Sequence, residues 1–379
     1  MNQPNCALCD IIITDENDTK EHIIPNAIGG RKKVKGFICK ACNNSTGNSW
    51  ESELAKQFNP LSLLFSINRE RGNVPSQLFE TTAGEKLKLN VDGSMANDKP
   101  VYTETPLGDN KVKINIQARD QKEAKSMLDG VKKKYPKFDI DDALNKLQIR
   151  SSYCPDMLKM DFSLGGAEAG RSIVKSALAL AVYSGITAST CKEAIDYLRN
   201  EESESCFGYF YESDLIRNRP EGIPIHCVSI KGCDKSNQVI AYVEYFGIQR
   251  MVLCLGSSYT GKAVSSTYSI NPITGEELNL EVELNISNAE IHQAYNYEKF
   301  PADAMEKAFH AVMPIAFENS HQRERERVLD KAILQAFNNC GAKEDERLTD
   351  EHIQNIMQTI INEIKPFLLH NMVKPNSHR

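Results

Sequence analysis

Alternation of apolar and polar residues predicts strands in two stretches of the chain. Leu87–Val91 and Val112–Ile116 alternate with a period of two, as strands with one buried face do. A second strand-rich stretch runs from Cys206 to Leu284, and turn residues at Asn271–Gly275 interrupt it. Within this second stretch we expect strands at Val239–Phe246, Met251–Leu255 and Ser266–Ile270.

Helical patterns fill much of the remaining chain. Ala167–Ile186 is rich in Ala and Leu and has a broad apolar face, so we expect a buried core helix there. Thr190–Arg199 is predicted to be a second helix, with Thr190 as its N-cap. Asp120–Lys134 and Asp139–Leu147 are two further predicted helices.

Two more helical regions lie toward the ends of the chain. Ser49–Phe58 is rich in Glu, Leu, Ala and Lys, and we expect Asn59-Pro60 to end this helix. After Pro301 the pattern is helical almost to the last residue, in at least two segments separated near residues 338–346.

These elements predict an α+β protein built from three consecutive parts. The chain has 379 residues, which is enough for two or three domains. We expect a compact N-terminal module at residues 1–60, a mixed α+β body at 61–300 and a helical C-terminal region at 301–379.

Hydropathy and charge narrow the classes of protein. No run of eighteen apolar residues occurs, so we expect no membrane span. Met1–Cys9 lacks the basic and apolar segments of a secretory signal, so we expect a cytoplasmic, reducing compartment. The net charge of -6 argues against a protein that coats nucleic acid by bulk charge. One local run reverses this sign, because it contains no acid and five basic residues: Arg31, Lys32, Lys33, Lys35 and Lys40.

Two cysteine pairs near the N-terminus carry the strongest chemical signal. Cys6-x-x-Cys9 and Cys39-x-x-Cys42 can each contribute two thiolates to one tetrahedral Zn²⁺. Four protein ligands leave no open position, so this zinc would be structural, and it would stabilise a module too small to bury a sufficient core. Unliganded thiols or two disulfides are the alternatives, and a reducing compartment disfavours the disulfides.

The residues between and after these pairs form a second pattern. Glu21-His22-Ile23-Ile24-Pro25 is followed by Gly29-Gly30, and Asn43-Asn44 comes directly after the last cysteine. Over residues 6–55 this arrangement resembles the HNH nuclease family. The resemblance implies a ββα-metal module, in which a two-stranded hairpin packs on a helix with one catalytic divalent metal between them.

The resemblance also implies roles for three residues. Glu21 matches the acidic metal ligand, His22 the general base and Asn43 the last metal ligand. A neutral histidine can take a proton from water near pH 7, and oxygen ligands suit Mg²⁺ or Mn²⁺. Asn43 is also well suited to cap a helix, which is the alternative for it. Adjacent residues of a regular strand point to opposite faces, so Glu21 and His22 share one site only at a bulge or strand end.

One position departs from the family pattern. The middle Asn of the family falls on Val34 in this chain, so the contact that usually orients the histidine has no counterpart there. Asn44 and Glu51 are candidates for supplying a substitute contact.

The combined prediction is a metal-dependent endonuclease that hydrolyses DNA, with the basic run contacting phosphates. The body would bind substrate, sense a signal or dock a partner protein. A nuclease module joined to a larger body is similar in architecture to bacterial defence (antiviral) and mobile-element nucleases. Two alternatives remain: a catalytically silent zinc module that binds nucleic acid or protein, and a nuclease that acts on RNA.

Overall fold

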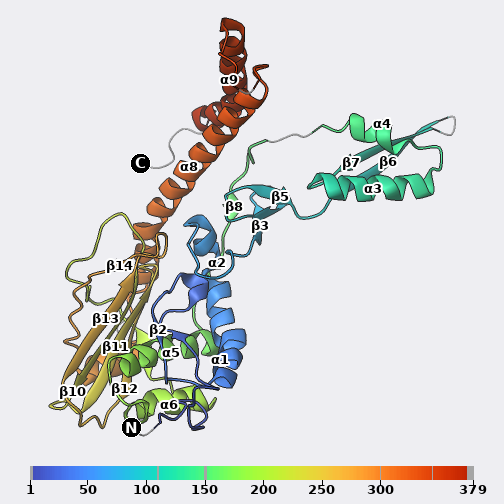
Figure 1. Ribbon diagram of the computed structural model, residues 1–379. Coiled ribbons are helices and arrows are strands. Elements are labelled where there is room, and N and C mark those ends of the chain that lie inside the picture. The colour runs from blue at the N-terminus through green and yellow to red at the C-terminus, as the bar shows by residue number, and fades with distance from the viewer. Residues whose placement is uncertain (1–2, 109–110, 149–151, 299, 344, 374–379) are drawn as a thin grey trace. The chain divides into compact units, whose positions relative to one another are not determined.

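The computed structural model describes residues 3–108, 111–148, 152–298, 300–343 and 345–373 (Figure 1). It has the α+β character expected from the sequence. The chain forms two compact units, and each unit combines segments that are distant in the sequence. Unit 1 contains Met1–Pro75 and Asp161–Ser320, and unit 2 contains Ser76–Met160 and His321–Arg379.

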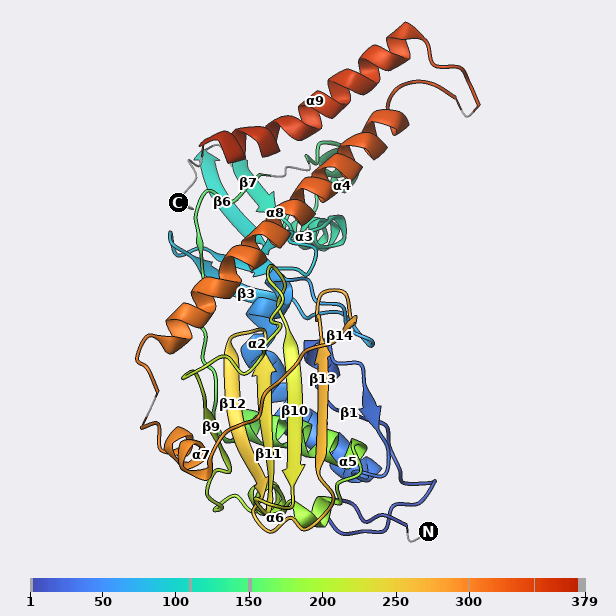
Figure 2. The same ribbon diagram turned by 90° about the vertical axis from the view of Figure 1, so that its left-hand side faces the viewer.

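Unit 1 is organised around a six-stranded sheet in which all neighbouring strands are antiparallel. The strands lie in the order β14-β13-β10-β11-β12-β9, and Figure 2 shows the longer ones side by side. The strands expected from the sequence are confirmed, and three more complete the sheet. Their bounds are β9 Phe207–Tyr209, β10 His226–Cys233, β11 Gln238–Tyr245, β12 Gln249–Gly256, β13 Val264–Ile270 and β14 Glu277–Leu278.

Both faces of this sheet are covered. Every residue of β11 is buried. Helix α5, Ala167–Tyr183, packs on one face against β10, β11, β12 and β13, and it is the buried core helix that the sequence predicts. On the other face, loop residues such as Phe210 and Leu280 and the helix α7, Asn288–Tyr295, form an apolar cluster with Tyr242 and its neighbours.

A short helix next to α5 begins later than expected. Helix α6 spans Lys192–Arg199 with Cys191 as its N-cap. Thr190, the predicted cap, instead belongs to the 3₁₀ turn η3, Ala188–Thr190. Its hydroxyl donates to the carbonyl of Thr187 at 2.7 Å, and this local bond competes with capping.

The N-terminal module of unit 1 is a hairpin followed by a long helical segment. The helical segment does not end at Asn59-Pro60, as expected, but continues to Leu64. Pro60 leaves the carbonyl of Lys56 without its helical partner, and Lys56 is exposed, so water can satisfy that carbonyl. The bounds are β1 Glu21–His22, η1 Asn26–Ile28, β2 Lys33–Val34, α1 Lys40–Thr46, the π-helical turn η2 Gly47–Glu51, and α2 Ser52–Leu64.

A buried histidine joins this module to the sheet. The Nε2 of His226 donates to the carbonyl of Ile28 at 2.8 Å, and its Nδ1 accepts from the backbone N–H of Phe246 at 3.0 Å. Burial lowers the pKa of His226 to about 3, so the ring is neutral and both nitrogens are satisfied. This residue is therefore a core contact between module and body.

Unit 2 contains two small sheets and two long helices. All strands and helices expected in this part of the chain are present, and the first sheet has the order β5-β4-β3-β8. The bounds are β3 Gln77–Thr81, β4 Lys86–Leu89, β5 Met95–Asn97, β8 Leu158–Lys159, the hairpin β6 Val101–Gly108 with β7 Lys111–Gln117, α3 Gln121–Lys134, α4 Ile140–Asn145 and α9 Asp350–Val373, with α8 Ala304–Asn338 entering from unit 1. In the part of the chain that the structure describes, no helix has the length and apolarity needed to cross a bilayer.

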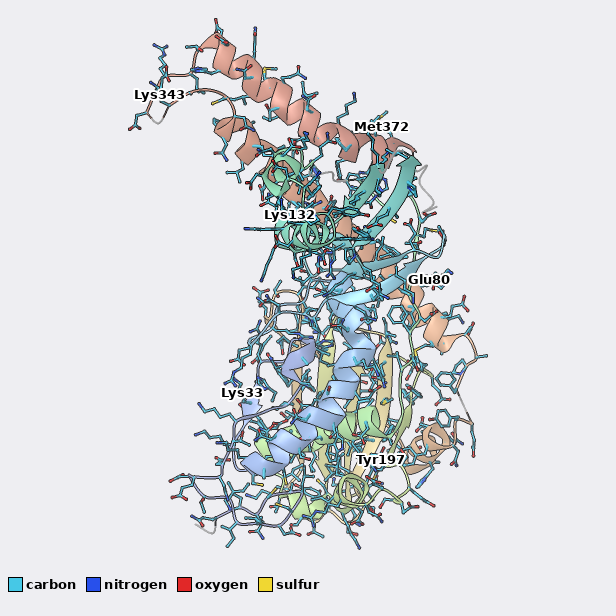
Figure 3. All side chains as sticks on the ribbon, turned by 90° about the vertical axis from the view of Figure 1, so that its right-hand side faces the viewer. Lys33, Glu80, Lys132, Tyr197, Lys343 and Met372 are labelled. Atoms are coloured by element: carbon cyan, nitrogen blue, oxygen red, sulfur yellow. The ribbon has the colours of Figure 1, made fainter. Side chains whose placement is uncertain are left out.

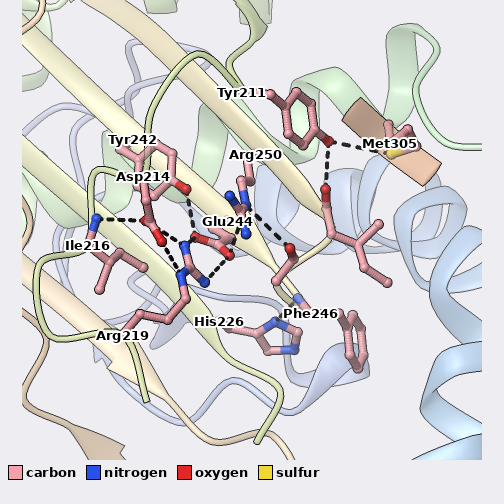
Figure 4. Close-up of polar contacts among 12 residues, drawn as sticks. Tyr211, Asp214, Ile216, Arg219, His226, Tyr242, Glu244, Phe246, Arg250 and Met305 are labelled. Atoms are coloured by element: carbon pink, nitrogen blue, oxygen red, sulfur yellow. Dashed lines mark hydrogen bonds and ion pairs between the residues drawn. The ribbon is translucent and has the colours of Figure 1, made fainter. Parts of the chain in front are cut away.

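Figure 4 shows a charged network on β11 and β12. The carboxylate of Glu244 is fully buried and accepts two hydrogen bonds from Arg219, at 2.8 and 3.0 Å. The hydroxyl of Tyr242 donates to it at 2.6 Å, and Arg250 lies 3.4 Å away. Arg219 also binds Asp214. A buried carboxylate needs such partners, because an unpaired one is strongly destabilising.

Substituting Arg219 is therefore expected to destabilise unit 1. Arg219→Ala leaves Glu244 with only Tyr242 and the more distant Arg250, and we expect the free energy of unfolding to fall by about 2–4 kcal/mol. Urea unfolding followed through Trp50, the one tryptophan of the chain, measures it.

Arg217→Ala is the matched control for this measurement. Its ion pair with Glu283 is exposed on both sides, so the change should stay within about 0.5 kcal/mol. Equal effects of the two substitutions would contradict a stabilising role for the buried network.

Candidate active site and metal cluster

Four cysteine sulfurs converge at the start of the N-terminal module. The Sγ atoms of Cys6, Cys9, Cys39 and Cys42 all lie within 4.8 Å of one another, and those of Cys9 and Cys39 are 3.7 Å apart. A tetrahedral zinc with bonds of about 2.3 Å has sulfur–sulfur edges of about 3.8 Å. The donor set and its spacing therefore fit one Zn²⁺.

Local backbone structure brings the two pairs together. Cys6 and Cys9 flank a tight turn in which the N–H of Asp10 bonds to the carbonyl of Cys6 at 3.0 Å. Cys39 is the N-cap of α1, and Cys42 lies in the first turn of that helix. The N–H of Cys39 donates to the Sγ of Cys6 at 3.3 Å, which links the two pairs directly.

The hairpin after the first pair separates Glu21 from His22. Glu21 pairs with Val34 and His22 with Lys33 in a regular antiparallel register. Glu21 and Val34 are buried, whereas His22 and Lys33 are partly exposed. The two predicted site residues therefore point to opposite faces of β1, as the alternation of a regular strand requires.

His22 forms a pair with a carboxylate from beyond the module's helices. Its Nε2 lies 2.9 Å from the Oε2 of Glu70, and the ammonium of Lys33 lies 2.7 Å from the same carboxylate. Figure 3 labels Lys33 on the outer side of the module. Lys33 and His22 hold the pKa of Glu70 at about 2, so Glu70 is an anion. An anion accepts the proton of Nε2, which leaves the lone pair of the ring on Nδ1.

The environment of His22 also sets its charge. Burial lowers the pKa of His22, and nearby Lys33 lowers it further, while Glu70 and Glu51 raise it. The net pKa lies below the usual value, so the imidazole is neutral at pH 7. A neutral, oriented imidazole is the form that a general base needs.

An asparagine of the module holds Glu70 in place. The N–H of Glu70 donates to the Oδ1 of Asn26 at 2.9 Å, and the Nδ2 of Asn26 donates to the carbonyl of Arg71 at 3.2 Å. The carboxylate that contacts His22 is thus fixed from the turn between β1 and β2, although it lies 48 residues along the chain from the histidine.

Glu21 enters a buried ion cluster on the other face of the hairpin. Its Oε1 lies 2.6 Å from the ammonium of Lys175, which also contacts the Oγ1 of Thr46 at 3.1 Å and a carboxylate oxygen of Glu51. Burial raises the pKa of Glu21 to about 8, with Lys175 opposing the rise and Glu51 adding to it. Burial acts to raise the pKa of Glu51, but Lys175, a hydrogen bond with Glu21 and nearby His22 together bring the pKa below its usual value, so Glu51 keeps its charge.

Asn43 contacts a different partner. Its Nδ2 donates to the Oγ1 of Thr19 at 2.7 Å. It is not the N-cap of α1, because Cys39 holds that place. Each of the two predicted metal ligands therefore has a side-chain partner within unit 1, Lys175 for Glu21 and Thr19 for Asn43.

The basic run divides into engaged and exposed residues. Arg31 donates to the carbonyl of Asn68 at 2.8 Å, Lys32 pairs with Glu277 at 2.8 Å, and Lys33 pairs with Glu70. The hydroxyl of Tyr268 accepts the N–H groups of Arg31 and Lys32, at 3.1 and 3.0 Å. Three of the five predicted phosphate contacts thus bind groups of unit 1, and the exposed ones are Lys35 and Lys40.

Sequence reasoning missed two residues of this region and gave one only as a candidate. Glu70 lies in an irregular loop, and no local pattern distinguishes it. Lys175 did leave a signal, because it is a lysine in the middle of a helix that is rich in Ala and Leu and predicted to be buried. Glu51 was a candidate for an extra contact, and its carboxylate binds Lys175 in the cluster with Glu21.

The comparisons with known proteins agree with this geometry. Residues 6–59 match the family described as HNH endonuclease. No curated protein and no solved structure matches the chain. The matched segment contains the four-sulfur cluster, the hairpin with His22 and the helices behind it. The N-terminal part of this chain, residues 6–59, is therefore a module of the HNH endonuclease family.

Proposed function

We propose that this protein is an endonuclease that hydrolyses phosphodiester bonds of DNA, with His22 as the general base. The observation that carries the proposal is the contact between His22 and Glu70, inside a module that matches the HNH endonucleases. A histidine on the partly exposed face of a hairpin, neutral and bound to an anion, has the properties of an activated base.

The proposed hydrolysis uses the tautomer of His22 that carries its proton on Nε2 and its lone pair on Nδ1. Nδ1 of His22 takes a proton from water, and the resulting hydroxide attacks the phosphorus atom. The P–O bond to the leaving sugar oxygen breaks in the same displacement, and that oxygen takes a proton from solvent water. The ring then carries a positive charge, which the carboxylate of Glu70 stabilises through Nε2, in the role that the aspartate has in a catalytic triad. The exposed Lys35 and Lys40 contact phosphates and position the strand without reading sequence.

A catalytically silent zinc module is the second candidate. Two observations favour it: buried Val34 takes the place of the family's middle Asn, and Glu21 is bound by Lys175. Under this reading the purified, zinc-loaded protein binds DNA with a salt-dependent affinity but does not cleave it.

Plasmid cleavage by His22→Ala tests the general base. We expect purified protein to nick supercoiled plasmid in buffer with Mg²⁺ or Mn²⁺, and His22→Ala to lower the rate by about 10²–10⁴-fold, because the general base is lost. His310→Ala removes an exposed histidine of α8 and should leave the rate unchanged. Cleavage that survives His22→Ala would assign the activity to another site.

Glu70→Gln tests whether Glu70 orients the imidazole of His22 or only helps the module to fold. Glu70 raises the pKa of His22, so Glu70→Gln lowers that pKa further. Activity rises with pH as His22 loses its proton, and the acid limb of the pH–rate profile should therefore move to lower pH. We also expect the rate at neutral pH to fall by about 10–100-fold, because the ring is less well oriented.

Glu277→Gln is the control for Glu70→Gln. It breaks the nearby ion pair with Lys32 and should leave the acid limb in place. If the limb of Glu70→Gln stays where it is in the unsubstituted protein, Glu70 does not act on His22.

Another prediction concerns the sulfur cluster. We expect one zinc per chain by elemental analysis, and we expect Cys42→Ser to lose this zinc and to lower the melting temperature, because the module then lacks its fourth thiolate. Cys233→Ser alters a half-buried thiol outside the cluster and should keep the zinc. Full zinc retention in Cys42→Ser would rule out a four-cysteine site.

A further inference from the structure

Three oxygen-bearing side chains of the HNH module surround a single ammonium group. The Nζ of Lys175 lies 2.6 Å from the Oε1 of Glu21 and 3.1 Å from the Oγ1 of Thr46, and it also contacts the carboxylate of Glu51. These three side chains come from β1, α1 and η2, so they belong to the hairpin and to the helical segment packed on it.

The ammonium itself comes from outside the module. Lys175 lies in the middle of α5, within the buried stretch Ala169–Ala181, and its side chain is 1% exposed. Helix α5 contacts β1, β2 and η2, so it delivers the lysine from the body into the gap between hairpin and helix. An ammonium is buried this deeply only when carboxylates compensate its lost hydration.

The backbone of η2 shapes the cage. Gly47–Glu51 is a π-helical turn, which adds a residue to the helical path between α1 and α2 and changes the direction of the side chains that follow. Glu51 is the last residue of this turn and points at Lys175. Thr46 donates its hydroxyl to the carbonyl of Asn43 at 3.2 Å, which leaves its oxygen lone pairs directed at the ammonium.

We propose that the Glu21–Thr46–Glu51 cage is the cation site between hairpin and helix, and that Lys175 is its resident cation in place of a divalent ion. Carboxylate and hydroxyl oxygens are the ligands that Mg²⁺ and Mn²⁺ take. A divalent ion bound at about 2.1 Å to the same oxygens would lie within about 3 Å of the ammonium, where the two charges repel strongly. The lysine and a divalent ion therefore exclude each other.

Mn²⁺ binding to zinc-loaded protein tests this directly. Free Mn²⁺ is counted by electron paramagnetic resonance during a titration without nucleic acid. We expect Lys175→Ala to bind one more Mn²⁺ per chain than the unsubstituted protein, because the cage loses its ammonium and keeps its carboxylates. The double variant Lys175→Ala with Glu51→Gln should return to the unsubstituted count.

Controls separate this effect from misfolding. Lys192→Ala removes an exposed lysine of α6 and should leave the Mn²⁺ count unchanged. Retained zinc and cooperative melting establish that Lys175→Ala is folded. If it does not fold, Lys175→Gln, whose amide still donates to the oxygens while removing the charge, replaces it in the same titration.

Two results would overturn the proposal. One is an unsubstituted protein that binds a Mn²⁺ which Glu51→Gln removes, because a divalent ion would then be the natural occupant. The other is a folded Lys175 variant that binds no additional Mn²⁺, because the three oxygens would then form no cation site. This inference deepens the proposed function, but the two are tested by separate measurements. The Mn²⁺ titration can contradict the cation site while the protein still cleaves plasmid, and plasmid cleavage can be absent while the titration gives the expected numbers of bound Mn²⁺.

Discussion

The burial of one positive charge organises the N-terminal half of unit 1. An ammonium without water must be surrounded by acceptors, so Lys175 fixes Glu21 and Glu51 on the inner side of the module. With Glu21 turned inward, the strand alternation turns His22 outward, where Glu70 meets it. The inner charge cluster and the outer histidine pair are thus two faces of one short hairpin.

A module of this size cannot bury enough apolar surface to be stable alone, and the chain supports it at both ends. At one end the sulfurs of four cysteines lie within 4.8 Å of one another, in a spacing that fits one Zn²⁺. At the other end the body supplies Lys175 from α5, His226 from β10 and the hydroxyl of Tyr268 from β13. These contacts also explain why part of the basic run binds unit 1 instead of facing solvent.

Local features were predictable from the sequence, and long-range partners were not. Cysteine spacing predicted the sulfur cluster, period-two alternation predicted the strands at Leu87–Val91 and Val112–Ile116, and the apolar run at Ala167–Ile186 predicted the core helix. Pro60 was expected to end a helix that packing extends past it. Glu70 and Lys175 were not predicted, because their partners His22 and Glu21 lie 48 and 154 positions away in the sequence. No local pattern in a single sequence indicates contacts over such separations.

The order in which the chain is synthesised determines when the N-terminal module can acquire its contacts with the rest of unit 1. Residues 6–59, which match the HNH endonucleases, leave the ribosome before the groups that complete this module are made: Lys175, His226, Tyr268 and Glu277. Domains generally fold as units during synthesis. A nascent or truncated chain that ends before Lys175 carries the inner carboxylates without their counter-ion. Completion of the module is therefore coupled to completion of unit 1, so residues 6–59 reach their final arrangement only when most of unit 1 has been made.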